Sequence, residues 1–317
     1  MNTPKLFIGP MSKNIVDNVA KMCYNVGLIP SRRQVEFDGG YVNGWKTKNF
    51  VDYVKRLGKD ILVCRDHGGP MQGKFEDSGV LSLTQDSHCM DIIHIDPWKT
   101  SLNFKECLYE TEKLMRFCFK INPDVFFEIG TEEGIRKLSS EQVYDLISYI
   151  KKTQFFNNVK FVVIQSGTKL KLDMNTGEYE ESRLIEMIKV VKEFDLLSKE
   201  HNGDYVESSI IRSKFDKGLD AINIAPEFGR METECYLDRL NGDEFESLFQ
   251  ICYESKTWVK WLNGDDSFNP FENKERIIKV CGHYVFSDKR FVELVRDIDI
   301  KEYLFEKMNK RVREILE

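Results

Sequence analysis

The stretch VKFVVIQ, residues 159–165, contains four apolar residues in a row, with no polar residue alternating among them. Such a strand is apolar on both faces, which is typical of a parallel sheet that is covered on both sides. Similar short runs recur along the chain, and longer segments with the apolar spacing of helices lie between them. The sequence therefore predicts an α/β fold with a parallel sheet.

Eight runs of this kind are present. We predict strands at residues 6–9, 28–36, 60–66, 91–96, 124–130, 159–165, 195–201 and 220–226. In the intervening segment SRLIEMIKVVKEF, apolar residues recur at helical spacing and would form one buried stripe: Leu184, Ile185, Ile188, Val191 and Phe194. Eight strand–helix units predict a (β/α)8 TIM barrel with additional C-terminal helices. A doubly wound open sheet is the competing architecture, and it is disfavoured because no G-x-G-x-x-G motif follows the first strand.

The chain beyond the eighth predicted strand is helical and charged, from ECYLDRLNGDEFESLFQ onward. We predict the (β/α)8 barrel over residues 1–262 and a C-terminal helical extension, packed on the barrel, over residues 263–317. The segment NGDDSFNPFEN, residues 263–273, is predicted to be a loop because Gly, Asp, Asn and Pro are concentrated in it.

The composition of the 317 residues limits the classes of partner. The hydrophobic fraction is 41%, the charged fraction is 31%, and the net charge is −6, which gives no indication of nucleic-acid or anionic-membrane binding. No apolar stretch approaches the roughly 20 residues of a transmembrane helix. The eight cysteines form no C-x-x-C pair, and several lie in apolar runs, as free buried cysteines do. We therefore expect a cytoplasmic protein that acts on a small molecule, without nucleic acid or membrane.

In barrels of this kind the chemistry occurs at the carboxyl ends of the strands. Many polar residues stand at the predicted ends: Arg32, Arg33, Gln34, Glu36, Arg65, Asp66, His67, His94, Asp96, Glu128, Glu132, Glu133, Gln165, Ser166, Thr168, Glu200, His201, Asn202, Asp204, Asn223 and Glu227. Three of the five histidines are among them. Imidazole and carboxylate groups that converge at one mouth suit Zn²⁺, or Mn²⁺ where oxygen ligands dominate.

The three histidines differ in their surroundings. His67 and His201 each begin a Gly- or Asn-rich turn and each adjoin an acid, which favours a functional role. His94 lies between Ile93 and Ile95, so a role in packing and a role in function are equally compatible with its position.

Several of the polar residues have simpler explanations. Glu132 and Glu133 suit the first turn of a helix, where negative charge is favoured. Asp204 suits a helix cap. Arg32 and Arg33 are adjacent on a predicted strand, so at most one of them would point into the barrel.

Five stretches resemble a known family, in the same order along residues 7–290: IPSRRQVEFDGGYVNG, ILVCRDHGGP, VVIQSGTKL, KEHNGDY and GHYVFSDKRF. They are similar to segments of the so-called non-catalytic subunit of class II tagatose-bisphosphate aldolase. That family also includes metal-dependent uronate epimerases and is related to the class II, zinc-dependent fructose-bisphosphate aldolases. The stretch FEIGTEEG in turn resembles a Glu-rich run of the class II aldolases. The resemblance implies a TIM barrel.

The resemblance also implies roles for individual residues. Asp66 would be the catalytic acid/base, His67 and His201 would be zinc ligands, and Glu128 would be a carboxylate at the metal. Either Glu132 or Glu133 would transfer a proton. The cofactor would be Zn²⁺, with Mn²⁺ as the alternative. We expect substrate contacts from further polar residues at the strand ends: Arg33, Gln34, Arg65, Asp96, Gln165, Ser166, Asn202, Asp204 and Asn223.

The chain departs from the family at two places. Gln165 stands where the catalytic class II aldolases have a histidine, although the closer family also has Gln there. The loop APEFGRMETE replaces a more apolar one, and its Glu227 would repel a phosphate, which weighs against a bisphosphate substrate. Arg33, Arg65, Lys169 and Arg230 are the candidates for the opposing charge, and spacing does not choose among them.

The leading hypothesis is a metal-dependent, class II aldolase-type enzyme that cleaves or forms a C–C bond in a ketose, sugar phosphate or sugar acid through an enediolate. The nearest alternative is a ketose or uronate epimerase that uses the same retro-aldol site. A third alternative is a non-catalytic subunit that stabilises a partner aldolase. Association into a homo-oligomer and association with an aldolase subunit both remain open.

Overall fold

Eight parallel strands form the core of the computed structural model, which describes residues 3–100, 102–171, 174–259 and 268–317. The strands are β1 (Leu6–Ile8), β2 (Val26–Leu28), β3 (Cys64–Gly68), β4 (Ile92–Ile95), β5 (Phe126–Ile129), β6 (Val159–Ile164), β9 (Leu197–Glu200) and β10 (Ala221–Ile224). Their order in the sheet is β2-β1-β10-β9-β6-β5-β4-β3.

The two end strands of this order, β2 and β3, also meet. Isolated parallel bridges join Leu28 to Val63 and Ser31 to Asp66. The Leu28 N–H donates to the Leu62 carbonyl at 2.9 Å, and the Asp66 N–H donates to the Pro30 carbonyl at 3.1 Å. The sheet therefore closes on itself, and the predicted (β/α)8 barrel is confirmed.

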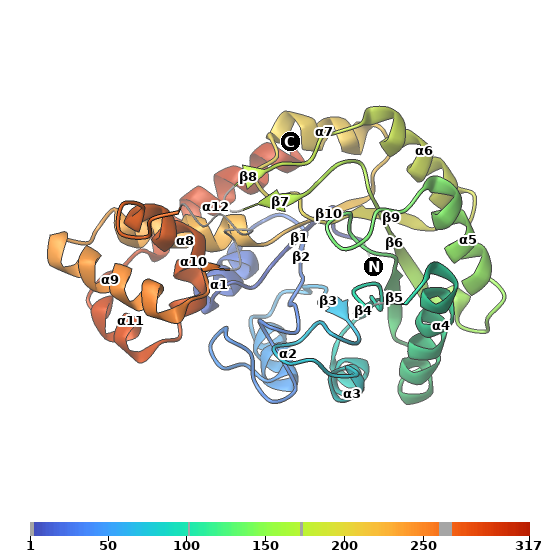
Figure 1. Cartoon of the computed structure of the whole chain (residues 1–317), viewed down its shortest axis with the longest axis horizontal. Helices are drawn as coiled ribbons and strands as arrows, with labels where there is room; N and C mark the ends of the chain where they lie inside the picture. Colours follow the sequence, from blue (N-terminus) through green and yellow to red (C-terminus); the bar gives the residue numbers. More distant parts are fainter. Residues whose placement is uncertain (1–2, 101, 172–173, 260–267) are drawn as a thin grey trace.

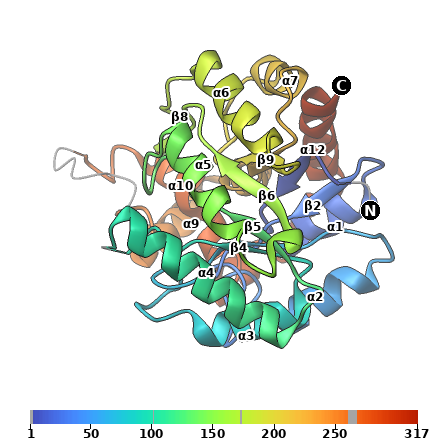
Figure 2. The ribbon, with the colours of Figure 1, turned by 90° about the vertical axis from the view of Figure 1, so that its right-hand side faces the viewer.

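Eight helices follow the eight strands and cover the outside of the barrel (Figures 1 and 2). They are α1 (Lys13–Lys21), α2 (Thr47–Arg56), α3 (Val80–Cys89), α4 (Phe104–Ile121), α5 (Ser140–Ile150), α6 (Glu181–Lys192), α7 (Ser208–Asp216) and α8 (Pro226–Leu237). Two begin with reciprocal capping boxes, Asn103 with Glu106 and Ser139 with Gln142.

In the described part of the chain beyond the barrel, four further helices follow, as predicted: α9 (Gly242–Ser255), α10 (Lys274–Val285), α11 (Lys289–Leu294) and α12 (Lys301–Leu316). Figure 1 shows α9, α10 and α11 gathered beside α8 on one side of the barrel, away from α4, α5 and α6. Helix α12 packs against α7, α8 and α1. The predicted boundary between residues 262 and 263, and the first part of the predicted loop 263–273, lie outside the described residues.

The second predicted strand is wrong over most of its length. Strand β2 ends at Leu28, and residues 29–36 form turns instead of continuing to Glu36. Pro30 has no N–H to donate to a neighbouring strand. The Ser31 carbonyl accepts the N–H groups of both Gln34 and Val35, which winds the chain into a turn. Three short elements were also not predicted: the strands β7 (Leu170–Lys171) and β8 (Met174–Asn175), and the 3₁₀ helix η1 (Phe156–Asn158).

The interior of the barrel has an apolar floor. Its buried members come from around the barrel: Phe7, Ile29, Leu62, Cys64, Ile92, Phe161 and Ala221. The rings of Phe7 and Phe161 meet edge to face with centroids 5.8 Å apart. Because side chains alternate along a strand, the inward positions two residues further toward the carboxyl ends include His94 and Asn223. The fold thus places polar side chains directly above an apolar floor.

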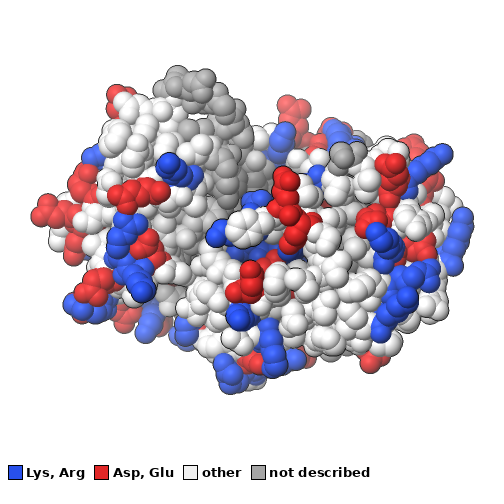
Figure 3. Space-filling model, turned by 60° about the horizontal axis from the view of Figure 1, so that its bottom comes forward, with Lys and Arg blue, Asp and Glu red and all other residues white. Residues whose placement is uncertain are grey.

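Charged side chains of both signs are distributed over the surface in Figure 3. On the face drawn in Figure 3, basic and acidic side chains are interspersed, and neither sign gathers into one large patch. Among the described helices, none combines the length and the hydrophobicity that a membrane-spanning helix requires. All eight cysteines are free, and most of them are buried, as expected.

A buried ion pair supports the junction between β2 and β3. Arg65 is fully buried, and its side chain lies on the opposite face of β3 from Cys64 and points toward the helices. Its guanidinium binds both carboxylate oxygens of Asp86 on α3, at 2.6 and 2.9 Å. It also donates to the carbonyls of Pro30 and Val35, each at 2.9 Å. One side chain therefore ties the chain that follows β2 to β3 and α3.

Replacing Arg65 by Met should lower the free energy of unfolding by about 3–5 kcal/mol, because Asp86 would remain as a buried charge without its partner. Urea unfolding measures this loss. The matched control is Lys48→Met, which removes an exposed Lys48–Asp52 pair with a 2.6 Å separation and should leave stability nearly unchanged. Equal effects of the two variants would contradict this role of Arg65.

A second buried carboxylate, Glu232 of α8, holds the turn before α1. It accepts hydrogen bonds from the Ser12 hydroxyl and, at 2.8 Å, from the Asn14 amide. Burial raises the pKa of Glu232 from 4.5 to about 7, although these two hydrogen bonds act in the opposite direction. The folded state therefore favours the protonated acid, and this contribution to stability is lost as the pH rises from 4.5 toward 7.

The variant Glu232→Gln keeps the shape of the protonated acid. At pH 8 we expect it to be more stable than the wild type by up to about 3 kcal/mol, and below the ordinary pKa of Glu the difference should disappear. Thermal or urea unfolding between pH 4 and pH 8 measures how the stability of the wild type and of the variant depends on pH. A difference that does not change with pH would exclude the proposed titration.

Candidate functional site

His67 lies at the end of β3, where the backbone is irregular. Its φ angle of 50° is uncommon for a residue other than glycine, and the pairing of β3 with β4 shifts register between Arg65 and Gly68. The Nδ1 atom of His67 lies 2.6 Å from Oδ2 of the fully buried Asp96. The main-chain N–H of His67 donates to Nδ1 of His94 at 3.2 Å. These contacts fix the ring with its Nε2 atom facing the barrel mouth.

His201 lies at the end of β9 and is held in a similar way. Its Nε2 atom lies 2.6 Å from Oε1 of Glu128, which is fully buried on β5. Its ring centroid is 5.2 Å from that of His67. A carboxylate that binds one ring nitrogen fixes the tautomer and leaves the lone pair of the other nitrogen available. The available atom of His201 is therefore Nδ1.

His94 occupies the interior of β4 and has a different arrangement. Its Nδ1 accepts the His67 N–H, so Nε2 carries the proton and donates to the Gly130 carbonyl at 3.0 Å. Burial lowers the pKa of His94, which keeps the ring neutral. Both ring nitrogens are thus engaged with the backbone. This geometry makes His94 a support for His67, although nitrogens of all three histidines lie within 4.8 Å of one another.

Asp66 lies between the two available nitrogens. Its Oδ1 is 3.8 Å from His67 Nε2 and 3.6 Å from His201 Nδ1. Glu132, on the loop after β5, places Oε2 at 3.6 Å from the same Nε2 of His67. The Asp66 side chain is 16% exposed and can be reached from the mouth. Two imidazole nitrogens and two carboxylates therefore face one small space.

The charges at this space favour a cation. Burial alone would raise the pKa of Glu132, but the hydrogen bond and charge of His67 outweigh it and lower the pKa to about 2. Burial would also disfavour a charged His67, yet Asp66, Asp96 and Glu132 raise its pKa well above the ordinary value. A proton on His67 thus balances several carboxylates, and a metal ion could replace that proton.

Lys199 supports this group from below. It is fully buried on β9, and its Nζ lies 2.7 Å from Oε2 of Glu128 and 4.0 Å from the centre of the Phe7 ring. Glu128 is therefore shared between Lys199 and His201. This places Glu128 behind His201 as its orienting partner. Sequence reasoning missed Lys199, although it shares the inward face of β9 with His201 by the two-residue period of a strand.

Asn223 and Asn202 add amide groups to the mouth. Asn223 is only 4% exposed, and neither polar atom of its amide has a hydrogen-bond partner among the described residues. A buried amide without a partner is costly, so this one is suited to a ligand. The Asn202 amide donates to Oε2 of Glu132 and so fixes that carboxylate.

Gln165 and Ser166 lie at the rim but are directed into the protein. The Gln165 side chain accepts the Leu138 N–H at 2.9 Å and donates to the carbonyls of Thr131 and Arg136, each at 2.8 Å. The Ser166 hydroxyl donates to Glu200 at 2.6 Å. These contacts shape the loops around the mouth and leave no side-chain group of Gln165 facing it.

Arg65 and Glu133 lie apart from the mouth. The donors of Arg65 are taken up by Asp86 and backbone carbonyls behind the barrel wall, as described above. Glu133 pairs with Lys137 at 3.1 Å. Of the two adjacent glutamates, the structure therefore brings Glu132 to His67.

Gln34 and Asp204 have structural contacts. The Gln34 side chain accepts the Ser31 N–H at 2.8 Å. Asp204 accepts the N–H groups of Ala225 and Glu227, at 2.9 and 2.8 Å, and so caps α8. The sequence suggested a cap for the next helical segment, but α7 begins after Glu207 without a side-chain cap, and Asp204 instead serves the start of α8, which is distant in the sequence.

Comparisons with known proteins reveal similarity in fold. No protein-family model and no curated protein sequence matches the chain. A solved structure described as a probable tagatose 6 phosphate kinase from Sinorhizobium meliloti 1021 is similar, with a TM-score of 0.71 and 16% identity over 98% of this chain and 93% of that chain.

Two further solved structures are similar. The fructuronate-tagaturonate epimerase UxaE from Cohnella laeviribosi has a TM-score of 0.69 and 10% identity over 99% of this chain and 81% of that chain. The YdjI aldolase from Escherichia coli K12 has a TM-score of 0.56 and 13% identity over 99% of this chain and 91% of that chain. At these identities the similarity establishes the barrel fold.

Lys199→Met should destabilise the fold by about 3–5 kcal/mol, because Glu128 would lose its buried partner. The ring ¹⁵N chemical shifts of His201 should also change, since Glu128 would then interact with His201 alone. The matched control is Lys214→Met, which removes a second buried Lys–Glu pair, with Glu200 at 2.5 Å, outside the barrel interior. It should destabilise to a similar extent and leave the His201 shifts unchanged. The same His201 shifts in both variants would contradict the arrangement.

Proposed function

We propose that the chain is a metal-dependent enzyme of the class II aldolase type that cleaves or forms a C–C bond in a ketose, a sugar phosphate or a sugar acid. One observation carries the proposal: Nε2 of His67 and Nδ1 of His201 face Asp66 at 3.8 and 3.6 Å. Each ring is oriented through its other nitrogen by a buried carboxylate. Such carboxylate–histidine pairs are the usual environment of metal-binding histidines.

The donor set fits Zn²⁺, or Mn²⁺ because oxygen donors are present. His67, His201 and Glu132 would hold the ion, while Asp96 and Glu128 would keep the two imidazoles in place. When bound, such an ion polarises the carbonyl of a ketose as a Lewis acid.

Asp66 is the proposed acid/base. It lies at the mouth, in reach of a substrate, and between the two histidines. In the cleavage direction its carboxylate would take the proton of the carbinol hydroxyl as the adjacent C–C bond breaks and an enediolate forms. In the reverse direction it would return that proton. A positioned group of this kind typically accelerates a reaction by about 10²–10⁴-fold.

Other side chains would bind and orient the substrate. The partnerless amide of Asn223 can accept from one substrate hydroxyl and donate to another oxygen. The apolar floor around Phe7 and Phe161 closes the barrel below the site and limits the access of water.

An epimerase is the second candidate. The same C–C cleavage, followed by rotation of the aldehyde fragment and re-formation of the bond, inverts a carbinol carbon. The similarity in fold to the fructuronate-tagaturonate epimerase, with a TM-score of 0.69, supports the epimerase as an alternative. The two reactions differ in their products, because an aldolase releases two fragments and an epimerase releases one isomer.

Metal analysis of chelator-free protein tests the proposal. We expect about one Zn²⁺ or Mn²⁺ per chain in the wild type, as in a single catalytic site, and loss of the metal in His67→Ala and in His201→Ala. The control His88→Ala removes an exposed histidine of α3 and should retain it. Protein that binds no metal, even after addition, would exclude the mechanism and favour a non-catalytic subunit.

Asp66→Asn separates binding from chemistry. The variant should keep the metal and lose about 10²–10⁴-fold in kcat, because only the proton-transfer group is removed. Product analysis with ketose phosphates and ketose sugar acids measures the rate and distinguishes cleavage from epimerisation. An unchanged kcat would show that Asp66 is not the acid/base.

A further inference from the structure

The loop between β9 and α7, residues 201–207, carries two parts of the candidate site. His201 is its first residue and a proposed metal ligand. The amide of the next residue, Asn202, donates to Oε2 of Glu132, which is another proposed ligand. Two of the three proposed ligands therefore depend on the conformation of this loop.

The backbone of this loop is strained. Asn202 and Tyr205 have φ angles of 57° and 60°, in the left-handed region that residues other than glycine seldom adopt. Between them, Gly203 lies so close to β10 that a Cβ atom on it would be 2.5 Å from the side chain of Ile222. A strained backbone of this kind persists only where the surrounding structure holds it in place. The contacts that hold this loop are therefore part of the construction of the site.

The first half of the loop is held from the segment that follows β6. The Thr168 hydroxyl donates to the His201 carbonyl at 2.8 Å. The Asn175 amide, on β8, donates to the carbonyls of Asn202 and Asp204, at 2.9 and 3.2 Å. These bonds act on the loop up to Asp204, so its second half depends on other partners.

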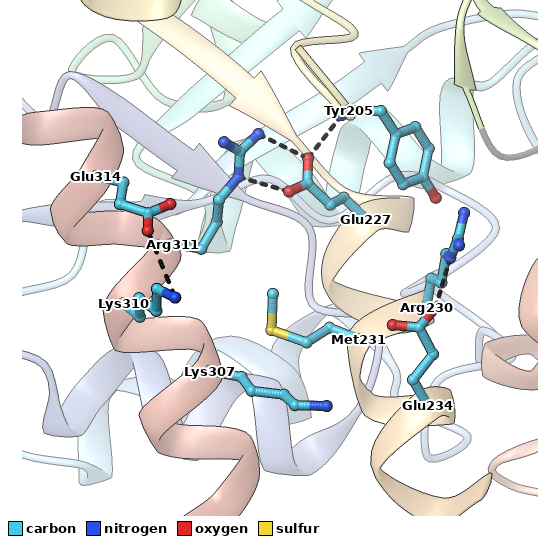
Figure 4. A pocket seen from close by; sticks show the side chains of 9 residues that line it. All are labelled: Tyr205, Glu227, Arg230, Met231, Glu234, Lys307, Lys310, Arg311 and Glu314. Atoms are coloured by element: carbon cyan, nitrogen blue, oxygen red, sulfur yellow. Dashed lines mark hydrogen bonds and ion pairs between the residues drawn. The ribbon is translucent and has the colours of Figure 1, made fainter. Parts of the chain in front are cut away.

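The second half of the loop is held by Arg311, which comes from the C-terminal helix α12. Its guanidinium binds both oxygens of Glu227 at the start of α8, at 2.6 and 3.1 Å. Oε2 of Glu227 in turn accepts the Tyr205 N–H at 2.7 Å, and Figure 4 shows this chain of contacts. Arg311 also donates to the Val206 carbonyl at 2.8 Å and to the Ser208 hydroxyl at 2.6 Å. One side chain thus ties α12 and α8 to the loop that carries His201.

The pair formed by Arg311 and Glu227 is suited to fix a position. The two side chains are only 14% and 12% exposed, and the planar guanidinium holds its donors in fixed directions. The pair borders a cavity of about 430 Å³ between α8 and α12. Two other cations of α12 line the same cavity, but Lys307 and Lys310 pair with acids outside the loop, at 3.4 and 3.9 Å. Among the described contacts, Arg311 is the cation that joins α12 to this loop.

We propose that Arg311 is a positioning residue for the candidate site. Through Glu227 and the Val206 carbonyl, it holds the loop after β9 in its strained conformation. That conformation in turn directs His201 and the amide of Asn202 toward the mouth. The proposal rests on the proposed function only for the identity of the metal ligands. The C-terminal helical extension is thereby a working part of the site.

The variant Arg311→Met tests this role in metal-free protein. The amides of residues 202–206 should exchange with solvent about tenfold faster, because charge-assisted hydrogen bonds that hold the loop are lost. The ring ¹⁵N chemical shifts of His201 should change as well. Zn²⁺, added alone, should bind about tenfold more weakly, at the lower end of the usual effect of residues that support metal ligands.

Two controls on the same helix separate positioning from a loss of stability or of charge. Met308→Ala removes a fully buried side chain and should lower stability without changing the loop exchange, the His201 shifts or the Zn²⁺ affinity. Lys307→Met removes a positive charge from the same cavity and should also leave all three readouts unchanged. If Arg311→Met does not fold because Glu227 is left unpaired, the double variant Arg311→Met/Glu227→Gln removes that charge and is compared with Glu227→Gln.

The readouts distinguish failure of this role from failure of the proposed function. Unchanged exchange and unchanged His201 shifts in Arg311→Met, or equal changes in Met308→Ala, would overturn the inference. Where the wild type binds Zn²⁺, an unchanged affinity in Arg311→Met would also overturn it. Faster loop exchange and altered His201 shifts, without Zn²⁺ binding even by the wild type, would support the positioning role and count against the proposed function only.

Discussion

The site depends on the requirement that a buried carboxylate must have a partner. Asp96 and Glu128 are fully buried, and each satisfies this requirement with one nitrogen of an imidazole. The choice of nitrogen determines which atom of each ring remains available. His67 offers Nε2 and His201 offers Nδ1, and both face Asp66. The orientation of the two imidazole rings at the mouth is therefore set by the buried carboxylates below them.

Much of the fold could be predicted because it follows from local patterns. The apolar runs placed seven of the eight barrel strands, and helical spacing indicated most of the helices between them. The second strand was misplaced because the apolar and β-branched residues around Pro30 hid a turn that depends on the carbonyl of Ser31. The placement of Asp66, His67 and His201 at one mouth followed from the rule that parallel strands end at one edge.

The finer roles depended on contacts between distant parts of the chain. Arg65 stands at a strand end like Asp66, but strand alternation turns it to the outer face, where its partner Asp86 comes from α3. Glu132 and Glu133 are neighbours, and only the path of the loop decides which one meets His67. No local pattern shows such pairings. Lys199 is the exception, since strand alternation alone would have placed it below His201.

The junction between β2 and β3 is built differently from the rest of the barrel. The other neighbouring strands are joined by backbone ladders, two of which shift register, whereas this junction has isolated bridges and the guanidinium of Arg65. Segments with few backbone hydrogen bonds open at a lower free-energy cost than the remainder of a fold. The barrel is thus a rigid arc with one compliant seam. His67 and the turn that carries Arg33 flank this seam, whereas His201 belongs to the arc, so one wall of the mouth can yield while the other stays fixed.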